Sequence, residues 1–153
     1  MRRFLPGTEP PVQAAPGGDA ALVALLVRAA RANADYNPLQ IAEIDSVIAR
    51  RFGLGPWEGA ALRRRAEALE ADTGDTVHLT RALKAFLPRD ARREFLRDLW
   101  SVILADGHRH DDEAGLMRLV SSLIGLRDRD SAHARQDIQA RMAASRDQSP
   151  LAR

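Results

Sequence analysis

The chain has 153 residues, of which 45% are hydrophobic and 29% are charged, which fits one globular domain with a buried core and excludes a disordered chain. It contains no cysteine, so disulfide frameworks and thiolate metal sites are excluded, and a reducing cytoplasm is expected. The net charge is only +2. The pI of about 9.9 is high because arginine supplies nearly all the basic residues. Neither value therefore indicates a nucleic-acid partner.

The two ends of the chain are predicted to lie outside the folded domain. Residues 1–18 are rich in Pro, Gly and Ala and are typical of a flexible leader, and residues 145–153 form a polar tail. The domain is therefore assigned to residues 19–144. No apolar run approaches the ~20 residues needed to cross a bilayer, and the basic N-terminus lacks the apolar stretch of a secretory signal. The sequence predicts a cytoplasmic protein without a membrane span.

Capping residues mark the first two helices. Asp19 can cap a first helix that carries leucine and alanine at helical spacing and ends near Asn33. Asn37 followed by Pro38 is a strong start signal for a second helix, because an N-cap residue is followed by proline at the first helical position. Gly53 is a natural C-cap for that helix. The sequence therefore predicts a helical hairpin at the start of the domain.

Five more helical segments follow, and none shows the alternation typical of strands. Helices are expected to begin at Pro56, at Asp75 or Thr76, and at Pro88, and a weaker one is expected over residues 130–144. The sixth carries an apolar stripe over residues 116–124. The predicted fold is a single-domain, all-α bundle of six or seven helices. Its expected core includes both tryptophans and four aliphatic residues on the predicted stripes, namely Leu26, Leu99, Ile103 and Leu123.

An internal repeat relates two of these hairpins. When Asn33 is aligned with Asp106, the preceding helices match, with Leu26 on Leu99, and the apolar-Gly-Leu sequence at residues 52–54 falls on residues 124–126 after one residue of slippage. Two hairpins of common ancestry are the simplest account, and chance similarity between amphipathic helices is the alternative. The repeat defines a first corner at residues 33–40 and a second corner at residues 105–113.

The second corner carries a short motif. Ala105-Asp106-Gly107 closes one predicted helix, Glu113 follows the aspartate, and Leu123-Ile124-Gly125-Leu126 closes the next helix. Over roughly residues 20–128 this pattern resembles the TerB-like family, named for bacterial tellurite resistance. The resemblance implies an all-helical cytoplasmic domain without established catalysis, associated with tellurite and other stress responses, whose acidic residues are suspected of binding metal. The first corner departs from the pattern, because Asn33 and Gln40 stand where the family carries acids.

Two interpretations of the second corner are open. The first is a cation site, for which carboxylates would suit Ca²⁺, Mg²⁺ or Mn²⁺ and imidazoles would favour Zn²⁺ or Ni²⁺. The second, which the sequence favours, is helix capping alone, because glutamate three residues after an N-cap can bond to the N-cap backbone and aspartates suit the positive end of a helix. The candidate metal ligands are Asp106, Glu113, Asp111, Asp112, His108 and His110.

The functional prediction follows from the family resemblance. We expect a non-enzymatic domain in tellurite, metal or general stress response that acts through protein partners, with a divalent cation as the one candidate cofactor. Neither a nucleophile with its base nor a phosphate-binding glycine loop is visible. A metal-dependent hydrolase at the second corner is one alternative. A nucleic-acid binder that uses the arginines at 63–65 and 89–93 is the other, and solvated helix faces explain both arginine groups better.

Overall fold

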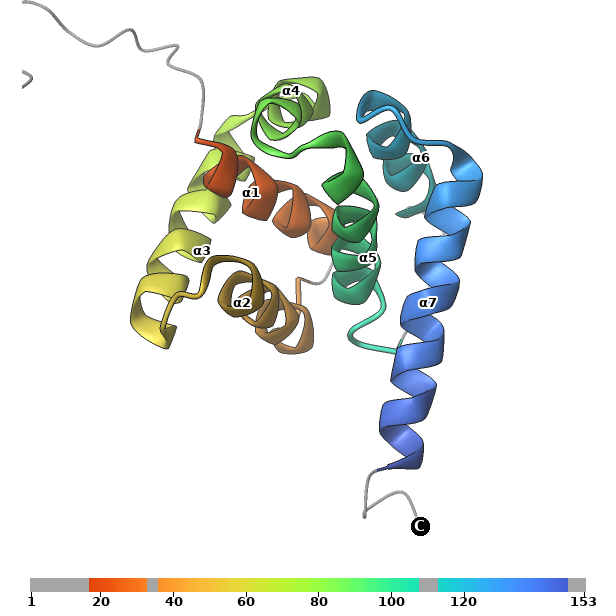
Figure 1. The fold of residues 1–153 in the computed structure, drawn as a ribbon. Coiled ribbons are helices and arrows are strands. Elements are labelled where there is room, and N and C mark those ends of the chain that lie inside the picture. Colours follow the sequence, from red (N-terminus) through yellow and green to blue (C-terminus); the bar gives the residue numbers. More distant parts are fainter. Residues whose placement is uncertain (1–16, 33–35, 108–112, 149–153) are drawn as a thin grey trace, which may run out of the picture.

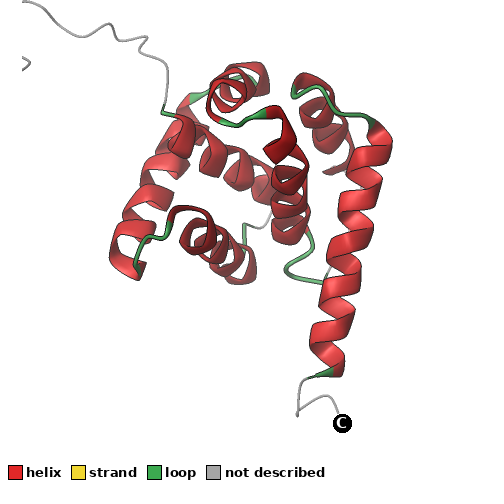
Figure 2. Ribbon diagram, in the orientation of Figure 1, coloured by secondary structure: helices red, strands yellow, loops and turns green. Residues whose placement is uncertain are grey.

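The computed structural model describes residues 17–32, 36–107 and 113–148. Within them the chain forms seven α-helices and a short 3₁₀ helix, with no strand (Figures 1 and 2). The predicted all-α class is therefore confirmed. The helices are α1 (Gly18–Arg31), α2 (Pro38–Phe52), α3 (Pro56–Asp72), α4 (Thr76–Phe86), η1 (Arg89–Ala91), α5 (Arg92–Ile103), α6 (Glu113–Leu123) and α7 (Asp128–Asp147).

The core is built around α1, which is buried on nearly every side. All residues from Ala21 to Val27 are at most 1% exposed, and α2, α3, α4, α5 and α6 all pack against this helix (Figure 1). A helix that is apolar all round can be stable in water only when other elements surround it. The leucine- and alanine-rich sequence of α1 therefore accounts for its central position.

Several helix ends form where the sequence predicted them. Asn37 caps α2 through its side chain, and Asp75 caps α4 by accepting a hydrogen bond from the His78 backbone N–H at 2.8 Å. Gly53 and Gly125, which the repeat aligns, both adopt left-handed backbone angles just after a helix, with φ of 64° and 80°. Glycine adopts this conformation without strain, which explains why both helices stop there.

Other boundaries differ from the prediction. Gly17 rather than Asp19 is the N-cap of α1, and Asp19 lies in the first turn. Pro88 does not open α5 directly, because a 3₁₀ turn comes before the α-helix at Arg92. The last helix begins earlier and ends later than residues 130–144. Short-range signals fix where a helix can start, but packing on neighbours decides how far the helix extends.

The predicted core is correct with two exceptions. Leu26, Leu99 and Ile103 are at most 1% exposed, whereas Leu123 is only partly buried. The prediction for Trp100 holds, at 5% exposed, but the one for Trp57 is wrong, because its side chain is 84% exposed. Two residues correspond to roughly 200° around a helix, so Trp57 lies on the side of α3 opposite the buried Gly59.

Helices α5 and α7 pack side by side and run in the same direction, so that both begin at the same end of the molecule (Figure 1). The turn that carries Asp106 lies at the other end of α5. Among the described helices, none combines the length and hydropathy that crossing a bilayer requires.

Candidate functional site

Within the described structure a hydrogen bond joins one residue of each corner. The amide Nδ2 of Asn37, in the first corner, donates to the carboxylate Oδ2 of Asp106, in the second corner, at 2.9 Å. The two residues lie 69 positions apart in the chain. The repeat in the sequence gave no sign of this contact. The corner that carries the acids is therefore anchored to the N-terminus of α2.

Asn37 can make this contact because its other amide end closes the helix. Its Oδ1 accepts from the Gln40 backbone N–H at 3.1 Å, and the Oε1 of Gln40 accepts from the Asn37 backbone N–H at 3.2 Å. This reciprocal pair is an Asn-x-x-Gln capping box, at the helix start that the sequence predicted. An amide offers both an acceptor and donors, whereas a carboxylate at residue 37 would offer no donor to Asp106.

Gln40 is fully buried beneath this corner, at 0% exposed. Its Nε2 has no hydrogen-bond partner among the residues that the structure describes. A buried amide without a partner destabilises a fold by about 1–3 kcal/mol. The capping box of the first corner thus includes a neutral side chain, Gln40, from which water is excluded.

Only part of the predicted cation site lies in the described structure. Asp106 lies in the turn after α5, next to Gly107, whose φ is 76°. Glu113 begins α6, but its side chain lies outside the described structure. Within the described ranges no group of three or more His, Asp or Glu side chains could hold a metal ion. The remaining candidates also lie outside the described residues, namely His108, His110, Asp111 and Asp112.

Tyr36 fixes the first corner to α3. Its hydroxyl donates to the carboxylate of Glu67, and the guanidinium carbon of Arg31 lies 5.2 Å from its ring centroid. Burial raises the pKa of Tyr36, and the hydrogen bond and negative charge of Glu67 raise it further. Tyr36 has a positive φ of 39°, which is uncommon outside glycine. These contacts hold the backbone in that conformation just before the cap.

A buried acid that sequence analysis missed lies between α2 and α5. Asp98 is 2% exposed, its Oδ1 accepts from Arg50 Nη2 at 3.2 Å, and its other oxygen accepts from Arg51. Burial raises its pKa, and the two guanidinium groups act in the opposite direction. The spacing contained a signal for this site, because Asp98 falls three residues after the buried Phe95 and four before the buried Val102.

A groove of about 560 Å³ passes this acid between α2, α5 and α7. Its walls include the apolar side chains of Leu39, Ile138 and Met142 beside Asp98 and Arg50. Since Asp98 is already bonded to two arginines, it does not offer a free acid–base group. We infer that Asp98, Arg50 and Arg51 hold α2 and α5 together.

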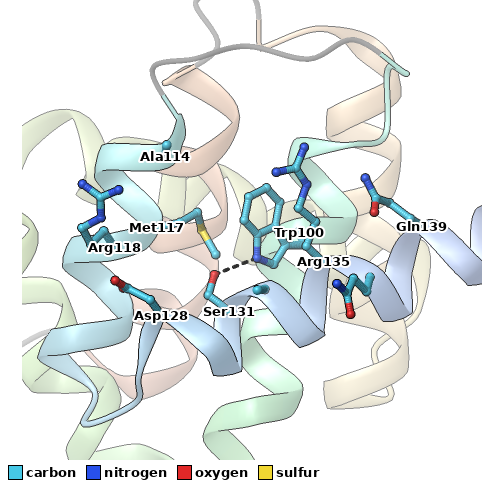
Figure 3. Close-up of a pocket in the computed structure, with 10 residues that line it drawn as sticks. Trp100, Ala114, Met117, Arg118, Asp128, Ser131, Arg135 and Gln139 are labelled. Carbon is cyan, nitrogen blue, oxygen red and sulfur yellow. Dashed lines mark hydrogen bonds between the residues drawn. The ribbon is translucent and has the colours of Figure 1, made fainter.

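A second cavity, of about 500 Å³, lies between α5, α6 and α7 (Figure 3). At its base the indole Nε1 of Trp100 donates to the hydroxyl of Ser131 at 3.0 Å. The guanidinium carbon of Arg135 lies 5.1 Å from the Trp100 ring centroid, an arrangement that stabilises the charge over the ring. Trp100 therefore contacts two of the polar side chains that line this cavity, Ser131 and Arg135.

The two arginine groups lie in different environments. Arg63 bonds to Asp45 at 2.7 Å and to Glu67 at 3.2 Å, so it belongs to the contacts between α2 and α3. Arg64 and Arg65 are exposed on the same helix. Arg92 donates to backbone carbonyls at the end of α4 and of α6. Arginines that are neighbours in the sequence therefore have different roles: some hold helices together, and others are exposed.

A family model described as "Tellurite resistance protein TerB" matches residues 19–136, which include both corners. Searches of the curated proteins and of the solved structures gave no match.

Proposed function

Because the chain belongs to the TerB tellurite-resistance family, we propose that it is a non-enzymatic domain of tellurite or metal stress response that holds a divalent cation at the second corner. We further propose that it works in the cytoplasm through protein partners. The observation that carries the proposal is the hydrogen bond from Asn37 to Asp106. Carboxylates that bind metal ions are commonly oriented by a neighbouring donor of this kind.

The chemistry of the two corners supports the same location. A hard divalent cation needs anionic oxygen to offset the loss of its water, and amide oxygens alone bind it weakly. Asp106 and Glu113 supply carboxylates, whereas Asn33 and Gln40 of the first corner are neutral amides. Asp106 supplies one ligand, and the others would come from residues 108–113. The first corner would contribute the donor that orients Asp106 and would not itself bind the ion.

The non-enzymatic part of the proposal rests on the residue types at the corner, which include carboxylates and imidazoles but no nucleophile with an orienting base. Partner binding is supported by Trp57, whose side chain is 84% exposed, because tryptophan on a surface is enriched at protein interfaces. A cation-dependent hydrolase activity that disappears with the acids of the second corner would contradict the non-enzymatic assignment.

The test is a double variant, Asp106→Asn with Glu113→Gln, which gives the second corner the neutral character of the first. The free energy of unfolding is measured with and without millimolar Ca²⁺, Mg²⁺, Mn²⁺ or Zn²⁺. A cation present at one hundred times its Kd should stabilise the natural chain by about 2.7 kcal/mol. The variant should remain folded and lose this response.

A matched control removes two acids elsewhere. Asp72 and Asp147 are exposed, and within the described residues neither side chain makes a hydrogen bond or ion pair. The variant Asp72→Asn with Asp147→Asn should keep the full response to the cation. If the corner only caps helices, the natural chain ignores all four ions, and the corner variant loses on the order of 1 kcal/mol or less without any cation. That pattern would overturn the cation site.

A further inference from the structure

A basic cleft lies at the end of the molecule where α5 and α7 begin. Its volume is about 840 Å³, and it is formed by η1, the first turn of α5, the turn after α6 and the first turns of α7. Residues from positions 89–93 and 125–133 meet there, although each group alone is an ordinary charged surface segment. The cationic side chains that line the cleft are Arg89, Arg93, Arg127, Arg129 and His133.

The cleft holds fewer acids than arginines. Asp130 contacts Arg93, with 3.3 Å between Oδ1 and Nη2, and its Oδ2 accepts from the Arg127 backbone N–H at 2.9 Å. That backbone hydrogen bond holds the pKa of Asp130 below its usual range, with a smaller contribution from Arg93. Asp90 is the second acid. Two aspartates face four arginines, which leaves two uncompensated positive charges.

Most of the cationic groups are available to a ligand. Across the described residues, the side chains of Arg89, Arg127, Arg129 and His133 make no hydrogen bond or ion pair, and all four are exposed. Elsewhere in the bundle arginines such as Arg28, which bonds to Glu70 at 3.0 Å, are engaged by acids from another helix. The cleft therefore gathers unpaired guanidinium groups in one concave place.

The helix arrangement adds to this positive field. Helices α5 and α7 run in the same direction, so their N-termini lie at the same end of the molecule (Figure 1). Residues near the N-terminus of each helix line the cleft. Each helix N-terminus carries a partial positive charge of roughly half a unit. Anionic groups are therefore stabilised at this end by the backbone as well as by the arginine side chains.

We propose that this cleft binds a small oxyanion, of the chemical class that includes phosphate and tellurite. Guanidinium groups present planar pairs of N–H donors that match the oxygens of such ions. One doubly charged ion would neutralise the two excess charges. Asp130 already demonstrates the chemistry, because its carboxylate lies between Arg93 and the α7 N-terminus. The ligand would bind beside it, on Arg89, Arg127 and Arg129.

This site is separate from the proposed cation corner. The cleft lies at the start of α5 and Asp106 lies just beyond its end, and a helix of 12 residues spans roughly 18 Å. Substitutions at one site leave the residues of the other unchanged. An experiment that disproves oxyanion binding in the cleft therefore leaves the proposed cation site untouched, and the reverse is also true.

The test follows the His133 imidazole by NMR while the full chain is titrated with sodium phosphate or sodium tellurite, at an ionic strength held constant with chloride. Tellurite can be used directly, because the chain has no cysteine to reduce it. We expect a saturable shift of the His133 resonances. Competition between the two ions reports whether they share the site, and if only one ion saturates, that ion is the ligand.

The paired variants remove two arginines each. Arg89→Gln with Arg127→Gln should weaken binding by about 10–100-fold, since each lost charge-assisted contact corresponds to roughly a factor of ten. Arg64→Gln with Arg65→Gln changes the net charge equally at exposed positions on α3 and should leave the affinity unchanged. A far-ultraviolet circular dichroism spectrum that matches the natural chain shows that each variant is folded.

Two results would overturn the proposal. One is a shift that grows linearly with ion concentration and is the same in the cleft variant and the control, which would mean non-specific screening. The other is tight, salt-sensitive binding of duplex DNA without saturable binding of either ion. That result would make the cleft part of a nucleic-acid surface.

Discussion

The two corners of the repeat close their helices in chemically different ways. In the first corner a pair of amides, Asn37 and Gln40, satisfies the start of α2, and Gln40 is completely buried. In the second corner Asp106 and Glu113, which align with Asn33 and Gln40, carry carboxylates, and Asp106 accepts a hydrogen bond from the first corner. Neutral amides can be buried because each offers both donors and acceptors. A carboxylate has acceptors only, so it needs a donor, water or a cation.

The comparison indicates how one scaffold can carry two corners of different chemistry. The first corner contributes rigidity, since Tyr36 and Asn37 connect it to α3 and to Asp106. The second can then present charge from a fixed position. Substitutions that alter the charge or the hydrogen bonds of these corners should therefore change the free energy of unfolding by different amounts. They follow from the largest expected change to the smallest.

The largest loss of stability is expected when a negative charge is introduced at the buried position 40 of the first corner. Gln40→Glu keeps an acceptor for the Asn37 backbone but puts a carboxylate at a position that is 0% exposed. An uncompensated buried charge destabilises by about 3–5 kcal/mol. Chemical denaturation at neutral pH measures this loss. Gln40→Leu, which is similar in volume and carries no charge, should lose less, about 1–3 kcal/mol.

The stability of the Gln40→Glu variant should depend on pH, and the direction follows from burial of the new carboxyl group. Burial raises the folded-state pKa of the introduced carboxyl above its unfolded value of about 4.3. Such a group binds more protons in the folded state than in the unfolded state. The stability of the variant therefore falls as the pH rises from the unfolded pKa through the folded-state pKa, and it is partly recovered in acid. A loss that is the same at pH 4 and pH 8 would show that the carboxylate has found a cation or donor in the corner.

An intermediate effect is expected when the link between the corners is removed. Asn37→Ala deletes both the helix cap and the bond to Asp106 and should destabilise by about 1–2 kcal/mol. Asp75→Ala is the matched control, because Asp75 caps α4 through His78 and no bond from it to another helix is recorded in the described structure. A double-mutant cycle with Asp106→Ala should give a coupling energy of about 1 kcal/mol. Zero coupling would mean that the bridge is not formed in solution.

The smallest effect is expected when the link is changed from attraction to repulsion. Asn37→Asp retains a good N-cap but replaces the donor to Asp106 with a second carboxylate. The partly exposed pair should lower stability by about 1 kcal/mol or less, and added sodium chloride should reduce the loss. Millimolar Ca²⁺ should recover the loss completely if the corner binds a cation. Recovery by sodium chloride and Ca²⁺ to the same extent at equal ionic strength would indicate screening alone.

Features of the fold that depend on neighbours in the sequence could be predicted. The capping box at Asn37, the cap at Asp75 and the left-handed glycine at Gly53 each involve residues within about four positions. The same is true of the apolar periodicity that gave the all-α class. These interactions are local, so the residue order alone is enough to specify them.

Other features required the arrangement of the helices in space. The bond from Asn37 to Asp106, the pairing of Asp98 with Arg51, and the basic cleft all join residues that are tens of positions apart. Periodicity identifies the apolar face of a helix, but it does not say which neighbour covers that face or where its ends remain exposed, as Trp57 demonstrates. The sequence by itself determined the helical class, the caps at Asn37, Asp75 and Gly53, and the repeat. The packing of α1, α2, α5 and α7 decided which charges meet, because those contacts depend on the positions and directions that helices adopt only when they share one core.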